Sequence, residues 1–363
     1  MADPNLLQLR VDGALYSGWT SVSVSRSLES VAGGFDLQFT SDPSAGLPDW
    51  KIPPGDQCEI LLGDDVVLVG YVDDLSVSYD AGQHDLKASG RDRTGDLVDC
   101  SAPSKRYASL TLPELATELA KPFGITVENK APGIKFHRTA HANQPGESIF
   151  RVLERRARQE AVLLISDGAG KLIVAEAGAG GDSGVTIEYG RDIKSASYQQ
   201  SAADLFSEIV VKGQSAGGGG DQFSLDDNVA SKGTVQRSVQ GMGIRRYRPL
   251  CIVAETQANS ARCASRARWE AGVREAKSKR WEVTVAGWRN ALGNLWQINT
   301  LVHLKCPLMG VDEQLLISSI QFTRDESGSV TNLKLAKKDA FKDLPEIPEP
   351  KKASSGNSYS LKG

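Results

Sequence analysis

The sequence predicts a mainly β protein of the α+β class, with two antiparallel β-barrels and small inserted α/β domains. Three observations predict this fold. Short segments of alternating apolar and polar residues fill residues 6–100 and return after residue 181. A hairpin near the N-terminus has an echo near the C-terminus. Helices with clear start signals lie between the two β regions, which indicates inserted domains.

The hairpin echo relates residues 75–92 to residues 320–339. Both segments alternate apolar and polar side chains, reverse direction at a glycine, and end in a cationic residue followed by Asp. Leu75 and Ile320 are 245 residues apart before the turn, and Leu86 and Leu333 are 247 apart after it. The turn glycines are Gly82 and Gly328. The pattern predicts two versions of one β unit in a single chain, although unrelated β-hairpins also share sequence features of this kind.

Residues 1–100 are predicted to form the first β-barrel domain. Val22 and Val24 alternate with serines, and residues 35–39 alternate apolar with polar side chains. Residues 59–62 meet residues 66–72 across a short Gly-Asp-Asp connection. Only an antiparallel sheet that closes on itself, or packs on another sheet, hides one face of so many short strands.

Residues 101–180 are predicted to form an inserted α/β domain with two helices. Thr111 and Glu114 form a capping box, and Pro122 ends the helix that follows. A second helix is expected after Pro145-Gly146, with outward arginines at Arg151, Arg155 and Arg158. Strands at 162–166 and 171–175 form a hairpin, and the glycine-rich residues 178–184 are interpreted as a linker.

Residues 181–343 are predicted to form the second β-barrel domain, with a mobile loop at 213–233 and a helix at 259–277. Residues 344–363 are predicted to be a disordered C-terminal tail, because they alternate proline with charged residues and end in small polar ones. Strands are expected at 185–189, 205–212, 247–255, 281–288, 295–306, 315–323 and 330–337.

Composition excludes some classes of function. The net charge is −3 and the pI is near 5.9, so the charge balance does not indicate affinity for nucleic acid. The longest apolar runs are far shorter than the roughly 20 residues of a membrane helix, so no membrane association is expected. The N-terminus lacks the features of a signal peptide, which favours synthesis in the cytoplasm. Five scattered cysteines without a C-x-x-C pair are expected to be reduced.

No catalytic, cofactor-binding or metal-binding residue is assigned, because each candidate motif lacks part of its context. Ser215 lies in a G-x-S-x-G motif, but glycines follow where a nucleophile elbow needs a helix, so a flexible loop is favoured. His137 and His141 are four residues apart but lack a glutamate and a third ligand, which favours a surface loop. His84 and His303 lie in strand patterns and are interpreted as structural.

Paired carboxylates and arginine-rich helix faces are the remaining candidates for a catalytic or phosphate-binding site. Neighbouring carboxylates on a strand point to opposite faces, so such a pair does not form a glycosidase site by itself. The pairs are Asp64-Asp65, Asp73-Asp74 and Asp226-Asp227. The arginine-rich faces of the second and third helices are interpreted as solvated surface or intersubunit salt links rather than phosphate sites.

Several long strings carry a family resemblance. Residues 16–33 and 88–100 closely resemble the Mu-like baseplate hub protein of contractile-tailed bacteriophages, the tail hub or late control D-like family. Residues 243–250, the alanine- and arginine-rich helix after them, and the pairs Gly287-Trp288 and Leu295-Trp296 look like the same family. The likeness follows chain order and is weakest at 213–233 and past residue 344.

The resemblance implies a homotrimeric ring with two tail-tube-like β-barrels per subunit, and hence pseudo-sixfold symmetry. It implies a non-enzymatic virion protein of the tail baseplate, without cofactors, which joins the tail tube protein to the central spike protein and contacts other baseplate proteins. A net acidic chain suits a channel through which phage DNA passes without specific binding. The C-terminal tail is expected to become ordered against the spike or a neighbouring subunit.

Two alternatives stay open at the level of sequence. Within the same class, the chain is a hub of a phage-tail-like bacteriocin or a secretion-spike module, assembled like a phage hub in the bacterial cytoplasm. In a different class, it is a tail-associated cell-wall hydrolase or a glycan-binding β protein.

Overall fold

The structure, a computed structural model, describes residues 6–42, 50–143, 145–212, 233–235, 244, 246–253 and 260–341. The strands are β1 (Leu7–Val11), β2 (Ala14–Tyr16), β3 (Ser21–Ser27), β4 (Gly34–Ser41), β5 (Gln57–Leu62), β6 (Asp65–Tyr79), β7 (His84–Asp92), β8 (Arg106–Leu110), β9 (Thr126–Lys130), β10 (Thr139–Ala142), β11 (Leu163–Ser166), β12 (Lys171–Ala175), β13 (Asp182–Glu188), β14 (Ile193–Gln200), β15 (Glu208–Lys212), β16 (Gly233–Val235), β17 (Pro249–Val253), β18 (Lys279–Ala286), β19 (Leu301–Cys306), β20 (Val311–Asp325) and β21 (Gly328–Ala336). The helices are α1 (Gly95–Asp99), α2 (Leu112–Ala120), α3 (Ile149–Gln159) and α4 (Ser260–Lys277), with short 3₁₀ turns at Lys121–Phe123, Pro307–Met309 and Lys338–Phe341.

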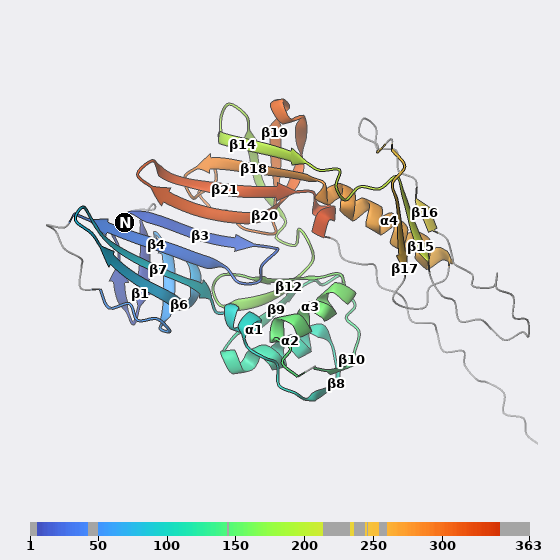
Figure 1. Cartoon of the computed structure of the whole chain (residues 1–363), viewed down its shortest axis with the longest axis horizontal. Helices are drawn as coiled ribbons and strands as arrows, with labels where there is room; N and C mark the ends of the chain where they lie inside the picture. The colour runs from blue at the N-terminus through green and yellow to red at the C-terminus, as the bar shows by residue number, and fades with distance from the viewer. Residues whose placement is uncertain are drawn as a thin grey trace, which may run out of the picture.

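One 13-stranded sheet dominates the molecule. Its main path runs β14-β18-β21-β20-β3-β4-β7-β6-β5-β1-β2, while β19 pairs with β20 and β13 pairs with β19. Figure 1 shows these strands as a stack across the view, with the α/β module below it and α4 to one side. The predicted mainly β, α+β fold with small inserted α/β units is confirmed, and the strand pairings join its two β units edge to edge.

The inserted module between β7 and β13 has its own core. A three-stranded sheet of β9, β11 and β12 packs with α1, α2 and α3 around a separate cluster of buried side chains. The predicted capping box is present, because the Thr111 side chain accepts from the Glu114 amide and Glu114 accepts from the Thr111 amide. Ser148 caps α3 in the same way by accepting from the Arg151 amide. These polar caps fix where both helices start.

A smaller module lies between β14 and β18. The three-stranded sheet β16-β15-β17 packs on α4, with Ile209, Val211, Cys263 and Ala267 buried between them. The predicted helix at 259–277 is therefore confirmed as α4. Most of the predicted loop at 213–233, with Ser215 and the Asp226-Asp227 pair, lies outside the described residues, as does the predicted tail at 344–363.

Two local expectations were wrong, and one strand was missed. Residues 178–184 do not form a loose linker, because Asn299 fixes them: its side chain accepts from the Gly178 amide at 2.6 Å, and its carbonyl accepts from the Gly180 amide at 3.0 Å. The strand expected from residue 295 starts only at Leu301, since Asn299 has a left-handed backbone with φ of 62°. Strand β14 was not predicted, because polar residues occupy most of its length.

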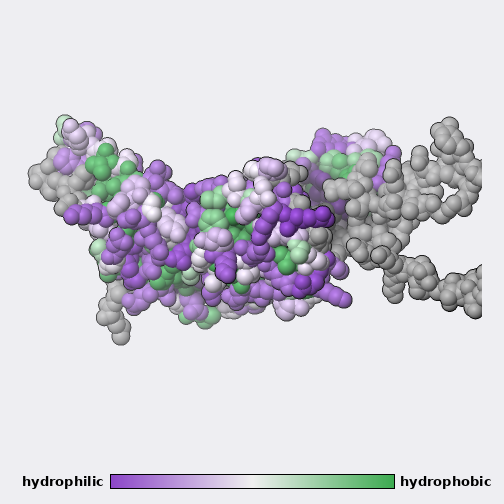
Figure 2. Space-filling view, turned by 90° about the horizontal axis from the view of Figure 1, so that it is seen from below, coloured by the Kyte–Doolittle hydropathy of each residue, from purple (hydrophilic) through white to green (hydrophobic). Residues whose placement is uncertain are grey.

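No helix in the described part of the chain is long and apolar enough to cross a membrane. The view in Figure 2 shows a mostly hydrophilic face with separate hydrophobic patches. On that face, apolar surface is divided among small areas rather than gathered in one broad patch.

Candidate assembly surface

The large sheet contains the same strand plan twice. The first β unit is defined here as β3, β4, β7, β6 and β5, which pair in that order, and the second β unit as β14, β18, β21, β20 and β19, which pair in the corresponding order. Every neighbouring pair within both units is antiparallel. The units differ at their outer strand, since β1 runs antiparallel to β5 while β13 runs parallel to β19.

The long hairpins of the two units match residue by residue. β6 and β20 each have 15 residues, and β7 and β21 each have nine. The register shifts between Val72 and Asp74 in one hairpin and between Ile317 and Ser319 in the other. These bulges occupy equivalent positions in the two strands, and a bulge sets the local twist of a sheet. The predicted repetition of one β hairpin is thus present in the structure.

The larger offset predicted after the turn, which equated Leu86 with Leu333, was wrong. Leu86 pairs with Val77, and the counterpart of Val77, Phe322, pairs with Thr331, so Leu86 corresponds to Thr331. One constant spacing therefore relates the hairpins on both sides of the turn.

The two turns share an aspartate contact but place their glycines one position apart. Asp80 accepts from the Gly82 amide at 2.6 Å in the first turn, and its counterpart Asp325 accepts from the Ser327 amide at 2.7 Å in the second. The glycine of the second turn is the next residue, Gly328, which adopts a φ of 104°. Aligning the two hairpins on their glycines was the source of the error.

Equivalent positions in the two β units also contribute buried side chains to the core. Strand β4 pairs with β7, and β18 pairs with β21, the counterpart of β7, so β4 and β18 are equivalent strands. In this alignment Phe35 corresponds to Trp281 and Leu37 to Val283. All four side chains are buried in the same continuous cluster, which spans both units. Along β5 and β19 the corresponding buried pairs are Cys58 with Val302 and Ile60 with Leu304. The repeat thus extends from backbone pairing to packing.

An internal joint connects the two units. The second half of β20 pairs antiparallel with β3, with Phe322 opposite Val24 and Thr323 opposite Ser23. Phe322 and Val24 are buried there, and so is Ile320. A second link runs between Arg289 and Asp65, whose side chains form an ion pair at 2.5 Å. One edge-to-edge joint between the repeated units is therefore complete within a single chain.

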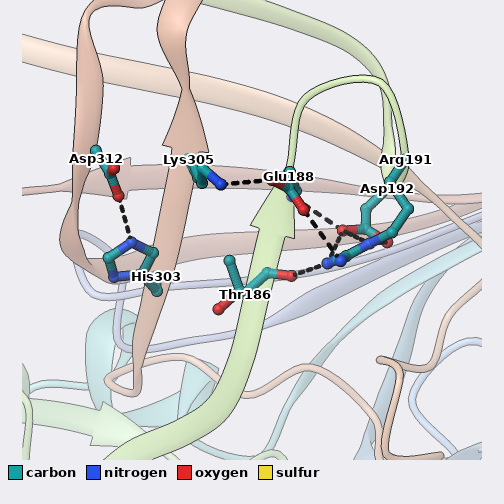
Figure 3. A network of polar contacts seen from close by, with 7 residues as sticks. All are labelled: Thr186, Glu188, Arg191, Asp192, His303, Lys305 and Asp312. Atoms are coloured by element: carbon teal, nitrogen blue, oxygen red, sulfur yellow. Dashed lines mark hydrogen bonds and ion pairs between the residues drawn. The ribbon is translucent and has the colours of Figure 1, made fainter.

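A polar network supports the outer end of the second β unit (Figure 3). Lys305 on β19 donates to Glu188 on β13 at 2.8 Å, and Arg191 in the turn before β14 donates to Asp192 at 2.8 Å and to Glu188 at 3.1 Å. The Lys305 ammonium holds the pKa of Glu188 below its usual value, and Arg191 does the same for the pKa of Asp192. The network fixes the turn that leads into β14.

The predicted histidines do not gather into a site. His137 and His141 lie in and beside β10 rather than on a helix, and the surface loop expected for them is in part this short strand. His303 lies 2.7 Å from Asp312 on the exposed side of β19, and His84 stacks edge-on against Tyr79. Within the described ranges, no group of three or more His, Cys, Asp or Glu side chains is arranged to hold a metal ion.

In each acidic pair that the structure describes, one member forms an ion pair with an arginine. Asp73 accepts from Arg91 at 2.8 Å and Asp65 binds Arg289, so members of two pairs serve separate ion pairs. Arg151, Arg155 and Arg158 face outward on α3, as predicted. Sequence reasoning missed Arg156, which is buried and pairs with Glu160 at 2.7 Å. The i,i+4 spacing of these two residues was the available signal.

Models of phage baseplate families match three parts of the chain. Residues 6–92 match the N-terminal part of the Mu phage baseplate assembly protein GpP-like family, and residues 94–176 match the second domain of the baseplate hub protein gp44-like family. Residues 259–345 match the fourth domain of Mu phage baseplate assembly protein GpP. The matches follow chain order and cover the first β unit, the inserted α/β module and all of the second β unit except β14.

Individual proteins agree with these matches. The chain is 31% identical to baseplate hub protein gp44 of Escherichia phage Mu, over 98% of this chain and 93% of that protein. The crystal structure of the 43 kDa tail protein of prophage MuSo2 from Shewanella oneidensis is similar with a TM-score of 0.82 and 34% identity, over 94% of this chain and 100% of that one.

A more distant structure shares the fold. The tail protein from Neisseria meningitidis MC58 is 22% identical with a TM-score of 0.76, over 93% of this chain and 99% of that one. The 31% identity to the phage Mu protein extends over nearly the full length of both chains and shows more than a shared fold. With the three family matches in order and the duplicated β unit, it establishes that this chain belongs to the Mu-like family of phage baseplate hub proteins.

Proposed function

We propose that this hub protein forms a homotrimeric ring with pseudo-sixfold symmetry, which joins the hexameric tail tube to the trimeric central spike and leaves a channel for DNA. The observation that carries the proposal is the duplicated β unit, whose long hairpins correspond residue by residue at one constant spacing. Three chains with two such units each present six similar surfaces. One ring can then meet a sixfold partner on one side and a threefold partner on the other.

Multiple contacts explain how such a ring would bind firmly. Each β unit offers one subunit of the tube a surface of similar shape, and binding the first subunit raises the effective concentration for the others. Individual contacts can therefore be weak. The expected partners are the tail tube protein, the central spike protein and other baseplate proteins, in a particle assembled in the host cytoplasm.

We assign no enzymatic activity to the chain. The related proteins are named as baseplate hub and tail proteins, and the matching family models describe baseplate parts. The carboxylates of Asp65 and Asp73 are engaged in ion pairs with arginines. The cell-wall hydrolase alternative predicts loss of turbidity in a peptidoglycan suspension, which a Ser215→Ala variant would abolish, and we expect no such loss.

The net negative charge of the chain supports the proposal that DNA passes through the ring without specific binding. The chain carries a net charge of −3, whereas tight phosphate binding requires clustered Lys or Arg. We expect the assembled protein not to retain duplex DNA in a gel-shift assay at physiological salt. Retention that weakens steeply with added salt would reveal a cationic lining and contradict this part of the proposal.

Mass measurement tests the ring. We expect light scattering of the purified full chain, over a range of concentrations, to approach three times the 38.9 kDa of one chain. Rotational averages of negatively stained particles should then show threefold symmetry with six outer lobes. A limiting mass of two or four chains, or a chain that stays monomeric at every concentration, would contradict the proposal.

A further inference from the structure

A cleft of about 300 Å³ lies where the inserted α/β module meets the second β unit. Its floor is the outer face of the large sheet. Lys334 lies between the buried Leu333 and Leu335 on β21, so its side chain points away from the core. Ser319 of β20 is paired with Lys334 and faces the same way. Figure 1 shows α3 of the inserted module below these two strands. The cleft thus lies outside the core, between the sheet and the module.

The cleft offers apolar surface that is not yet fully covered. Phe150 and Leu163 of the inserted module line it, and both side chains are only half-buried. Phe341, in the 3₁₀ turn that follows β21, also lines the cleft and is half-buried against a small cluster of buried alanines. Covering half-buried aromatic and aliphatic side chains with an apolar ligand is favourable. The cleft can therefore bind a segment that carries apolar side chains.

The cleft also carries an excess of positive charge. Three cationic side chains that line it, the cleft cations, form no ion pair within the described residues: Lys277, Lys279 and Arg280. The other two cations of the lining are already paired there, Arg158 with Glu154 at 2.6 Å and Lys334 with Glu282 at 3.6 Å. Glu29 is the one acidic residue of the lining outside these pairs. An acidic ligand therefore meets complementary charge in this cleft.

The chain itself leaves the described region at this cleft. Phe341 is the last described residue, so the residues that follow it start at the lining of the cleft. Residues 342–350 read Lys-Asp-Leu-Pro-Glu-Ile-Pro-Glu-Pro, with three carboxylates against one lysine. Leu344, Ile347 and Glu349 each precede a proline, which favours an extended polyproline II backbone. An acidic, proline-rich segment is thus tethered beside a cationic cleft.

The spacing of the side chains in this segment matches the two kinds of surface. A polyproline II helix has three residues per turn, so side chains three positions apart share a face. Asp343, Glu346 and Glu349 then form an acidic face, and Leu344 and Ile347 form an apolar face beside it. Nine residues in this conformation span about 28 Å, so the segment is long enough to lie along the cleft. Its two faces can therefore meet cations and apolar side chains at the same time.

We propose that residues 343–350 bind in this cleft of their own copy, with the acidic face toward the cleft cations and the apolar face against Phe150 and Leu163. Proline-rich segments bind apolar grooves in this way, because a backbone that is already extended loses little entropy on binding. The tether at Phe341 keeps the effective concentration of the segment at the cleft high. The bound segment links the inserted module to the second β unit. This contact goes beyond the proposed ring and does not depend on it.

Disulfide trapping in the full chain tests this binding. Leu163→Cys with Ile347→Cys places one thiol in the cleft and one on the apolar face of the segment. Equilibration in a glutathione redox buffer gives the effective concentration of one thiol at the other. A tethered but unbound segment should give a value of roughly millimolar, as flexible linkers do, and binding should raise this value roughly tenfold or more. Cys100 and Cys251, which are not buried, are replaced by serine in every sample.

A second cleft position and a matched control accompany this pair. Ser319→Cys on the cleft floor, combined with Ile347→Cys, leaves the apolar lining intact and should show a similar increase. Arg268→Cys with Ile347→Cys is the control, because Arg268 lies beside the same 3₁₀ turn but lines a separate hollow with Lys337 and Asp339. Its effective concentration should stay at the value of an unbound tether. Circular dichroism should be the same for all three pairs.

Charge reversal provides an independent test. Lys277→Glu with Lys279→Glu should lower the effective concentration between the cleft thiol and the segment thiol by roughly threefold or more, because like charges then face each other. Glu346→Lys with Glu349→Lys should do the same, and combining all four changes should restore the original value. Arg151→Glu is the control, since Arg151 is exposed on α3 but does not line the cleft. High salt should reduce the difference between the variants.

Each outcome supports or overturns the proposal. Equal effective concentrations at the two cleft positions and at Arg268 would show that the segment does not bind in the cleft. Disulfides between chains, seen as dimers or trimers on a non-reducing gel, would place the segment in the cleft of a neighbouring copy and overturn binding within one copy. Charge reversals without effect would refute the contact with the cleft cations. None of these results changes the mass expected for the ring, so the two proposals fail separately.

Discussion

Gly70 and Gly90 allow β6 and β7 to approach each other unusually closely. A Cβ atom at Gly70 would lie 1.8 Å from the Arg91 carbonyl oxygen, and one at Gly90 would lie 2.1 Å from the Tyr71 carbonyl oxygen. The same Cβ at Gly90 would also meet the buried Phe35 ring at 2.8 Å. Because these obstacles include backbone and a core ring, rotation of a flexible side chain cannot relieve them.

Gly90→Ala should therefore destabilise the first β unit by about 2 kcal/mol or more, as overpacking of a dense core does. Gly34→Ala is the matched control, because its added Cβ would sit at an ordinary 3.5 Å from the Gly90 carbonyl oxygen in the same sheet. Urea unfolding followed by circular dichroism gives both free energies of unfolding. Equal losses in the two variants would show that close approach is not the reason for glycine at position 90.

At the scale of elements, helix starts are set by local chemistry that sequence reveals. The capping box of Thr111 and Glu114 satisfies amide groups that the first turn of α2 leaves free. Buried Leu112, Leu115 and Leu119 then hold this helix on the module's core. The boundary of α2 therefore depends on one hydroxyl and one carboxylate.

Thr111→Ala should lower the free energy of unfolding of the inserted module by about 1 kcal/mol, since an amide of the first turn loses its acceptor. Ser109→Ala, two residues earlier on the exposed surface of β8, should change it by less than half as much. Hydrogen exchange of the α2 amides reports this local stability directly. Faster exchange in the Ser109 variant than in the Thr111 variant would contradict the role of the cap.

Elements with strong local signals were predictable, whereas pairings that depend on distant residues were not. The hairpin of β11 and β12 was predicted because apolar residues flank Asp167, whose side chain accepts from two amides of its own turn. Strand β14 escaped prediction because only Ile193, Ala196 and Tyr198 face the core among serines, glutamines and a lysine. Its strand conformation comes from pairing with β18, roughly 80 residues later in the chain.

The same reason limited the prediction of the assembly surface. The duplication was visible in the hairpins, whose short-range alternation repeats. The joint of β3 with β20 links segments from opposite ends of the chain, and no local pattern encodes that contact. That joint becomes recognisable only when both units are compared in three dimensions.

At the scale of the whole molecule, Arg26 connects three parts of the fold. It lies on β3 of the first β unit, donates to the Ser166 carbonyl of the inserted module at 2.7 Å, and donates to Gln297, just before β19, at 3.3 Å. Asp92 lies nearby and accepts from the Gly33 and Thr94 amides. Burial raises the pKa of Asp92, so removal of the neighbouring cation makes its ionised form still more costly.

Arg26→Ala should therefore cost about 3 kcal/mol of stability, because it leaves a buried carbonyl without its donor and a buried carboxylate without its cation. Arg10→Ala is the matched control: Arg10 pairs with Glu59 at the surface, where an ion pair contributes within about 1 kcal/mol. Urea unfolding gives both values, and hydrogen exchange locates the loss. Exchange should accelerate together in residues 163–175 and in β6, because Val69 donates to the Gly168 carbonyl across the same junction. Losses of similar size in both variants would mean that the junction stabilises the molecule no more than an exposed ion pair does.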